Sequence, residues 1–160
     1  MRRGILCALA VLALAACGGP KDLAVVGKTH VTKRDYEQAV THFRLEAQAN
    51  GRSFDEASAK PHIVSLLLYR AELAEAGRRL GITVSDRDAA ARVAANSSSG
   101  EADAQAQDFG FQLASARASL YYERIYLRVT RGVPAAKRDA VMRTWVRTNH
   151  AALAKETRLS

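Results

Sequence analysis

The segment from Pro61 to Leu80 constrains the fold of this chain more than any other part of the sequence. Its large apolar residues occupy more than one face of a helix. They are Ile63, Val64, Leu66, Leu67 and Leu68. A helix that is apolar on several sides must be surrounded by other elements. Because Pro fits the first helical position and Gly81 gives a stop, the segment predicts a central helix in a multi-helix domain.

Before this segment, the sequence predicts one full helix and one short helix. Thr32 is a good N-cap, apolar residues follow it at helical spacing, and Asn50-Gly51 ends the pattern. The apolar stripe consists of Tyr36, Val40, Phe43 and Ala47. Ser53 and Glu56 have the spacing of a capping box, which predicts a short helix that Pro61 interrupts.

After the central helix, Ser85 is the predicted N-cap of a helix over about 86–96. Val93 is its single large apolar residue, so this helix should lie at the periphery. Residues 96–100 read Asn-Ser-Ser-Ser-Gly and predict a flexible break, and residues 101–108 predict a loose polar helix.

Two more helices complete the predicted bundle. Phe109-Gly110-Phe111 is the expected start of a long helix that ends near Thr130. One of its faces carries Leu113, Ala116, Leu120 and Leu127, and the adjacent face carries Tyr122, Ile125, Tyr126 and Val129. Pro134 is the expected start of the last helix, whose apolar side has Val141, Met142, Trp145 and Val146.

Short strands are predicted at both ends of the helical part. Leu23–Val26 and Thr29–Thr32 are separated by Gly27-Lys28, and Gly first in a two-residue turn favours a type II′ hairpin. Because an isolated hairpin is marginal in water, it needs a packing partner. Residues 155–160 are a candidate third strand beside Leu23–Val26. The predicted fold class is therefore mainly α with a short N-terminal β-hairpin and a C-terminal strand.

The N-terminal residues carry a targeting signal. Arg2 and Arg3 precede a short apolar run over 5–13, and Leu14-Ala15-Ala16-Cys17 follows it. This arrangement is typical of a secretory signal peptide. Its ending in Cys resembles the bacterial lipobox, at which the Cys is lipidated; the alternative is a plain secretion signal with an incidental Cys. We expect residues 1–16 to be a cleaved signal peptide, 17–22 a lipidated (palmitate-bearing) Cys17 with a short linker, and 23–160 one helical domain.

This signal bounds the location and chemistry of the mature chain. A membrane-spanning helix needs about 20 residues, and the apolar run is shorter, so the lipid would anchor the protein outside the cytoplasmic membrane. Gly18 after the Cys resembles outer-membrane sorting, facing the periplasm, in a host with two membranes. Cys7 leaves with the signal and Cys17 carries lipid, which excludes disulfides, thiol catalysis and Cys-ligated metals.

The charge balance indicates which partners to expect. Without residues 1–16 the chain keeps 22 Lys and Arg against 16 Asp and Glu. A basic surface favours contact with anionic lipid and attracts acidic polypeptides. The basic residues are dispersed without a run, so nucleic acid is not an expected partner of an anchored, exported protein.

Three motifs stand in order along the chain. Val31-Thr32-Lys33-Arg34-Asp35-Tyr36 follows the turn, Leu80-Gly81-Ile82-Thr83-Val84-Ser85-Asp86 follows the apolar helix, and Phe109-Gly110-Phe111 precedes the long helix. Over about residues 23–146 they resemble the N-terminal domain of SurA/PrsA-type extracytoplasmic chaperones. The resemblance implies that domain's helical fold and an ATP-independent holdase for unfolded exported polypeptides.

The chain departs from that family in two places. Gly27-Lys28 replaces the family's Asn-Gly turn. Gly132-Val133-Pro134 joins the long helix directly to the last one, where relatives usually carry a parvulin prolyl isomerase domain. The isomerase activity is therefore not carried over, and no enzyme activity is expected.

The sequence contains no pattern that indicates catalysis or a cofactor. His30, His42, His62 and His150 are scattered, and no Gly-rich phosphate loop or Gly-x-Ser-x-Gly motif occurs. Carboxylate pairs such as Asp86 and Asp88 are explained by helix N-termini. We therefore assign no catalytic, cofactor-binding or metal-binding residue.

Aromatic residues are the candidate client-binding surface: Tyr121, Tyr122, Tyr126 and Trp145. Core packing is the other interpretation of these residues, and it is the preferred one for Tyr122 and Trp145. Adjacent helical residues point about 100° apart, so Tyr121 and Tyr122 cannot both face one core, and one should be open to a partner. Arg124, Arg128 and Arg131 would attract acidic clients.

The preferred hypothesis is a membrane-anchored holdase. The alternative is a lipoprotein scaffold or accessory subunit that binds one partner of a secretion or polysaccharide-export system, and a prolyl isomerase is less favoured.

Overall fold

The computed structural model describes residues 22–96 and 102–159, with the side chains of residues 102–107 left out of the description. The elements of this part are β1 (Asp22–Val26), β2 (Thr29–Thr32), α1 (Lys33–Ala49), α2 (Glu56–Arg79), α3 (Asp86–Asn96), α4 (Ala102–Val129), α5 (Ala135–Ala154) and β3 (Thr157–Leu159). The predicted signal peptide, Cys17 and the break at 97–100 lie outside the described residues. The mainly helical class with a hairpin and a C-terminal strand is confirmed.

The strands form a small antiparallel sheet in the order β2-β1-β3 within the described part of the chain. Val26 pairs with Thr29 of β2 and with Thr157 of β3, so both ends of the domain meet in one sheet. Gly27 has φ +60°, the value that the first position of a type II′ turn requires. The third strand that the sequence predicted at the C-terminal end is therefore confirmed.

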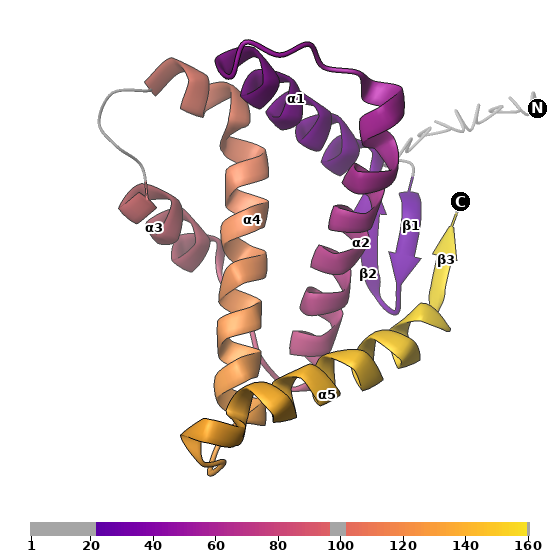
Figure 1. Ribbon diagram of the computed structural model, residues 1–160, viewed down its shortest axis with the longest axis vertical. Coiled ribbons are helices and arrows are strands. Elements are labelled where there is room, and N and C mark those ends of the chain that lie inside the picture. The colour runs from indigo at the N-terminus through magenta and orange to yellow at the C-terminus, as the bar shows by residue number, and fades with distance from the viewer. Residues whose placement is uncertain (1–21, 97–101, 160) are drawn as a thin grey trace, which may run out of the picture.

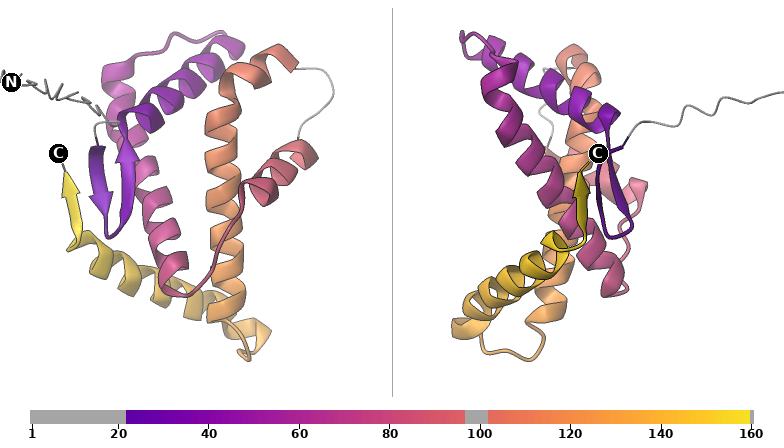
Figure 2. Two further views of the ribbon diagram at one scale, coloured as in Figure 1. Left: turned by 180° about the vertical axis from the view of Figure 1, so that it is seen from behind. Right: turned by 90° about the vertical axis from the view of Figure 1, so that its right-hand side faces the viewer.

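Two long helices form the frame of the domain (Figure 1). α2 and α4 pack against each other and cross at an angle, as the right-hand view of Figure 2 shows, while α1 lies near one end of the pair and α5 near the other end. The sheet lies against α2, and α3 packs on the outer side of α4, as Figure 2 shows from behind. α2 contacts both strands of the hairpin and α1, α4 and α5, which confirms its predicted central place.

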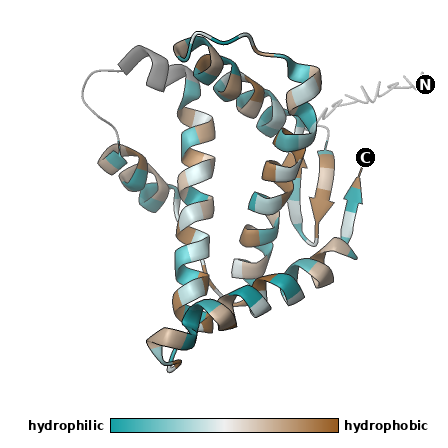
Figure 3. Cartoon of the chain, in the orientation of Figure 1, coloured by the Kyte–Doolittle hydropathy of each residue, from teal (hydrophilic) through white to brown (hydrophobic). Residues whose placement is uncertain are grey.

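Apolar side chains gather where these elements meet. The main cluster joins the hairpin and α1, α2, α4 and α5, and Val26, Ile63, Ile125 and Leu153 are fully buried in it. Of the three strands, β1 shows the strongest hydrophobic colour in Figure 3, as expected for the middle strand. A separate cluster of Ala89, Val93, Ala116 and Leu120 holds α3 on α4, which confirms the peripheral position of α3.

Several helix ends lie where the sequence predicted them. Thr32 and Asp35 form a capping box at the start of α1. At α3, the Asp88 N–H donates to Ser85 Oγ and the Ser85 N–H donates to Asp88 Oδ2. Pro134 is the N-cap of α5. The caps at Thr32 and Ser85 work because their side chains satisfy backbone donors that a helix start leaves free, whereas Pro134 makes no side-chain cap hydrogen bond.

The start of α2 differs from the prediction. Asp55, not Ser53, is the N-cap, and its carboxylate accepts from the Ala57 N–H at 3.0 Å. This choice leaves Phe54 just before the cap, where it packs against the core. Pro61 neither interrupts the helix nor starts a new one, because α2 runs through it. Its missing N–H frees only the Ala57 carbonyl, and Ala57 is exposed to water.

The expectations for α4 were wrong in two respects. The helix begins at Ala102 and passes through Gly110 instead of starting there. A Cβ at Gly110 would lie 2.3 Å from Gln38 Nε2, so the glycine serves the close approach of α1 to α4. Leu127 was expected on the apolar face but is 67% exposed. α3 covers only part of that face (Figure 1). Ala116 and Leu120 pack against α3, whereas Leu127 lies beyond the cluster that α3 forms with α4.

Candidate functional site

The four aromatic residues predicted to bind clients do not share one surface. Tyr121 is half-buried against α2, and Tyr126 is half-buried with its hydroxyl donating to Asp139 Oδ1 at 3.1 Å. Tyr122, for which core packing was the preferred interpretation, is instead 38% exposed, because Tyr121 takes the position against α2. Trp145 is half-buried on α5. The structure thus separates Tyr122, which is open to a partner, from Tyr121, which is used in packing between the two long helices.

Tyr122 lines a hollow between α2, α4 and α5, which we name the tyrosine hollow. Its volume is about 490 Å³, and its lining is Tyr69, Tyr122, Asp139, Met142, Arg143, Val146, Arg147 and His150. Tyr69 is 45% exposed, and its pKa is raised by burial and then by the neighbouring Tyr122 and Glu72. Two amphipathic rings from α2 and α4 therefore face a mixed side of α5, on which Met142 and Val146 are apolar and the other lining residues are charged or polar.

Polar side chains join α5 to the frame at the edges of this hollow. His150 Nδ1 lies 2.8 Å from Glu72 Oε2 of α2. The Tyr126 hydroxyl of α4 donates to the Asp139 carboxylate of α5. Burial is the main cause that raises the pKa of Tyr126, and the Asp139 carboxylate is the second. Arg143 and Arg147 form the cationic part of the lining.

A further apolar hollow lies around Trp145, between α5 and the end of α4. It measures about 580 Å³ and is wide open. Its lining is Val129, Lys137, Ala140, Val141, Thr144, Trp145 and Thr148. It shares no lining residue with the tyrosine hollow, so α5 carries apolar surface on two sides.

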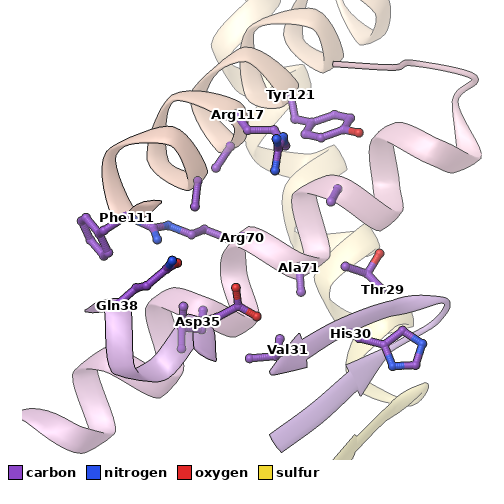
Figure 4. A pocket seen from close by; sticks show the side chains of 14 residues that line it. Thr29, His30, Val31, Asp35, Gln38, Arg70, Ala71, Phe111, Arg117 and Tyr121 are labelled. Atoms are coloured by element: carbon purple, nitrogen blue, oxygen red, sulfur yellow. The ribbon is translucent and has the colours of Figure 1, made fainter. Parts of the chain in front are cut away.

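A smaller pocket lies between α1, β2, α2 and α4 (Figure 4). We name it the alanine pocket, because Ala71 and Ala74 of α2 and Ala114 and Ala118 of α4 line it. Its volume is about 130 Å³, and Arg70, Arg117 and Tyr121 also line it. Tyr121 packs on Gly77, where a Cβ would lie 2.4 Å from the ring. This contact brings α2 and α4 together, while the alanines leave space between them.

One predicted cation has another role. Arg124 donates to Asp88 Oδ2 at 2.9 Å and also to the Thr83 carbonyl, so it fastens the start of α3 to α4. The same contact lowers the pKa of Asp88. Arg124 is therefore not the free client-attracting cation that was expected.

A buried carboxylate was missed by the sequence reasoning. The side chain of Glu75 on α2 is fully buried and accepts hydrogen bonds from Arg78, Arg79 and the Lys28 N–H. The Arg78 hydrogen bond contributes most to lowering the pKa of Glu75 from 4.5 to about 2. Arg79 also contacts Glu156. This network ties the hairpin turn and the start of β3 to α2, so its role is structural.

Tyr69 and Arg70 were also missed, since both follow directly on the apolar run from Ile63 to Leu68, which was assigned to core packing. Within residues 22–96 and 102–159, no group of three or more His, Cys, Asp or Glu side chains is arranged to hold a metal ion. In the same residues, no helix has the length and apolarity to cross a membrane.

Comparisons with protein-family models, with curated proteins and with solved structures give no match to this chain.

Proposed function

We propose that the protein is a membrane-anchored, ATP-independent holdase that binds apolar segments of unfolded exported polypeptides in the tyrosine hollow. The observation that carries the proposal is the pair of exposed rings, Tyr69 and Tyr122, facing Met142 and Val146 across an open hollow. The lipobox-like N-terminus and the three motifs similar to SurA/PrsA-type chaperones support the location and the class.

The chemistry of the lining suits a client without a fixed sequence. Tyr contributes a large apolar area at a low cost in side-chain conformational entropy, and its hydroxyl can remain hydrogen-bonded to water. Arg143 and Arg147 add attraction for acidic segments. Covering the open part of one ring, on the order of 80 Å², gives about 2 kcal/mol. Two such rings give weak, reversible binding, so release by mass action needs no nucleotide.

An aggregation assay tests the proposal. Light scattering of a diluted, unfolded exported protein should fall when the wild-type protein is present in stoichiometric excess. The double variant Tyr69→Ser/Tyr122→Ser should lose most of this suppression, because both rings are gone. Leu127→Ser is the matched control, since it removes a more exposed apolar side chain outside the hollow. Absence of suppression by the wild type, or equal suppression by the double variant, would contradict the proposal.

Crosslinking distinguishes the holdase from a scaffold with one partner. A photoreactive residue placed at position 122 should give many substoichiometric products in cells if clients are diverse. A single stoichiometric product would favour the alternative, an accessory subunit dedicated to one partner.

A further inference from the structure

The alanine pocket contains a cation, Arg70, that has no ion-pair partner among the described residues. Tyr69 and Arg70 are adjacent in α2, so their side chains point about 100° apart and the two sites lie on different sides of the helix. Arg70 lines the alanine pocket, and Figure 4 shows its side chain extending from α2 towards Phe111 of α4.

The Arg70 guanidinium is held in a fixed position. Its Cζ lies 4.1 Å from the centre of the Phe111 ring, and the His42 ring stacks on Phe111 with a centroid distance of 3.9 Å. At such short distances the two groups must occupy opposite faces of the ring. Arg70 Nη2 also donates to Ser115 Oγ. Phe111 therefore positions the Arg70 guanidinium, and Ser115 engages one of its N–H donors.

Arg70 makes no ion pair within the described part of the chain. Asp35 and Asp108 are the carboxylates that act on its charge, but neither lies within ion-pair distance of the guanidinium, and Ser115 is its one hydrogen-bond acceptor among these residues. Burial lowers the pKa of Arg70 to about 10, although Asp35 and Asp108 act in the other direction. The group therefore remains a cation at neutral pH, with most of its five N–H donors free for a ligand. A half-buried unpaired charge is costly, and an anion would compensate it.

The rest of the lining suits an anion that carries an apolar group. Arg117 reaches the pocket from α4, and its ion-pair partner Asp86 is largely exposed. Gln38 and Tyr121 add further donors. The carboxylate in the lining, Asp35, accepts from both the Thr32 N–H and the Thr32 hydroxyl at 2.7 Å. The alanine walls offer apolar contact over a volume close to the ~150 Å³ of a cavity that holds benzene.

We propose that the alanine pocket binds a carboxylate attached to a short apolar group, with Arg70 as its anchor and the four alanines against the apolar part. Two sources share this chemistry: the carboxyl terminus of a polypeptide and a free aliphatic acid. The proposal is independent of the holdase function, because the site lies on a different side of α2 and uses no residue of the tyrosine hollow.

The test uses three probes in titrations followed by amide NMR of the full chain. They are a tetrapeptide that ends in leucine with a free carboxylate, the same peptide amidated at that end, and 4-methylpentanoate. At least one of the two acids should shift the amide signals around Arg70 and Ala114, and the amidated peptide should bind at least tenfold more weakly. Binding of the free-acid peptide alone would identify chain ends as the source, and binding of 4-methylpentanoate alone would identify small acids.

Two variants separate the charge from the shape of the pocket. Arg70→Met keeps an apolar stem beside Phe111 and should remove the preference for the carboxylate, whereas Arg143→Met, in the other hollow, should not. Ala114→Leu fills the pocket, keeps the charge, and should weaken binding at least tenfold. Equal binding of acid and amide, no shift with either acid, or unchanged discrimination by Arg70→Met would each overturn the proposal.

Discussion

Replacing Glu75 by Gln should destabilise the protein more than any exposed charge substitution. The carboxylate is fully buried and accepts hydrogen bonds from Arg78 at 2.6 and 2.9 Å, from Arg79 at 2.9 Å and from the Lys28 N–H at 3.3 Å. Gln offers one acceptor oxygen and turns an NH₂ donor towards the arginines. The substitution therefore weakens the joint between the hairpin and α2.

The size of the effect follows from the pKa. Lowering the pKa of Glu75 from 4.5 to about 2 corresponds to about 3 kcal/mol of folding stability. The side chains of Arg78 and Arg79 are 49% and 36% exposed, so solvent screening reduces this to about 2 kcal/mol at neutral pH. Because the folded pKa is the lower one, this stability is present above the unfolded value and is lost as the pH falls from about 4.5 towards 2.

Urea unfolding at neutral pH and near pH 3 measures both quantities. Far-UV circular dichroism and the fluorescence of Trp145, the single tryptophan, report the transition. The cost of Glu75→Gln should fall by about half near pH 3. Glu123→Gln is the matched control, since its pair with Arg92 is largely exposed and should contribute less than about 1 kcal/mol. A cost of Glu75→Gln that is independent of pH, or no larger than that of the control, would refute the reasoning.

Three further substitutions test the packing, each measured by the same unfolding curves. Gly77→Ala should cost about 1–3 kcal/mol, because the new Cβ would meet the Tyr121 ring at 2.4 Å; an unchanged midpoint would contradict this contact. Leu153→Ala should cost about 2–5 kcal/mol, since Leu153 is fully buried where α5 leads into β3, and a cost below 1 kcal/mol would count against that anchor. Ser85→Ala should cost about 1 kcal/mol by removing the α3 cap, and Ser85→Asp should restore it.

Features that depend on neighbouring residues could be predicted from the sequence. The hairpin turn needs only a glycine able to adopt positive φ, and the caps at Thr32 and Ser85 are formed within three residues. The central place of α2 also follows from its own composition, because its apolar residues leave no single solvent face. The return of the chain as β3 was a longer-range inference, which rested on the need of the hairpin for a partner.

The features that were missed depend on contacts between distant elements. From the sequence alone, Gly110 indicates the start of a helix. Its actual role, to allow the close approach of Gln38 of α1, depends on a contact between two helices. From the sequence alone, Pro61 indicates a break in the helix. The helix can continue through it because the Ala57 carbonyl, which loses its hydrogen bond, is exposed to water. Nothing in the sequence distinguishes Glu75 from the other charged residues. Its burial depends on the packing of the hairpin turn at Lys28 against α2. The exposure of Leu127 depends on how far α3 extends along α4.

The candidate sites were partly accessible to the same reasoning. The 100° rule required one of Tyr121 and Tyr122 to leave the core, and the exposed ring is Tyr122. Its companion Tyr69 comes from another helix, 53 positions earlier in the printed sequence, so no local pattern connects the two rings. Arg70 is likewise distinguished from other arginines only by Phe111 and the surrounding alanines.

Near the edges of the tyrosine hollow, long polar side chains join α5 to the frame, in addition to the apolar contacts that Leu153 makes with the main cluster. Apolar side chains that pack directly would bring α5 against α2 and fill the space. Instead, Glu72 and His150 meet at 2.8 Å, and the Tyr126 hydroxyl reaches Asp139 at 3.1 Å. Only Met142 and Leu153 of α5 are buried among its described apolar residues. Along this stretch polar contacts take the place of apolar packing, and Tyr69 and Tyr122 remain 45% and 38% exposed, which is the surface that a client would need.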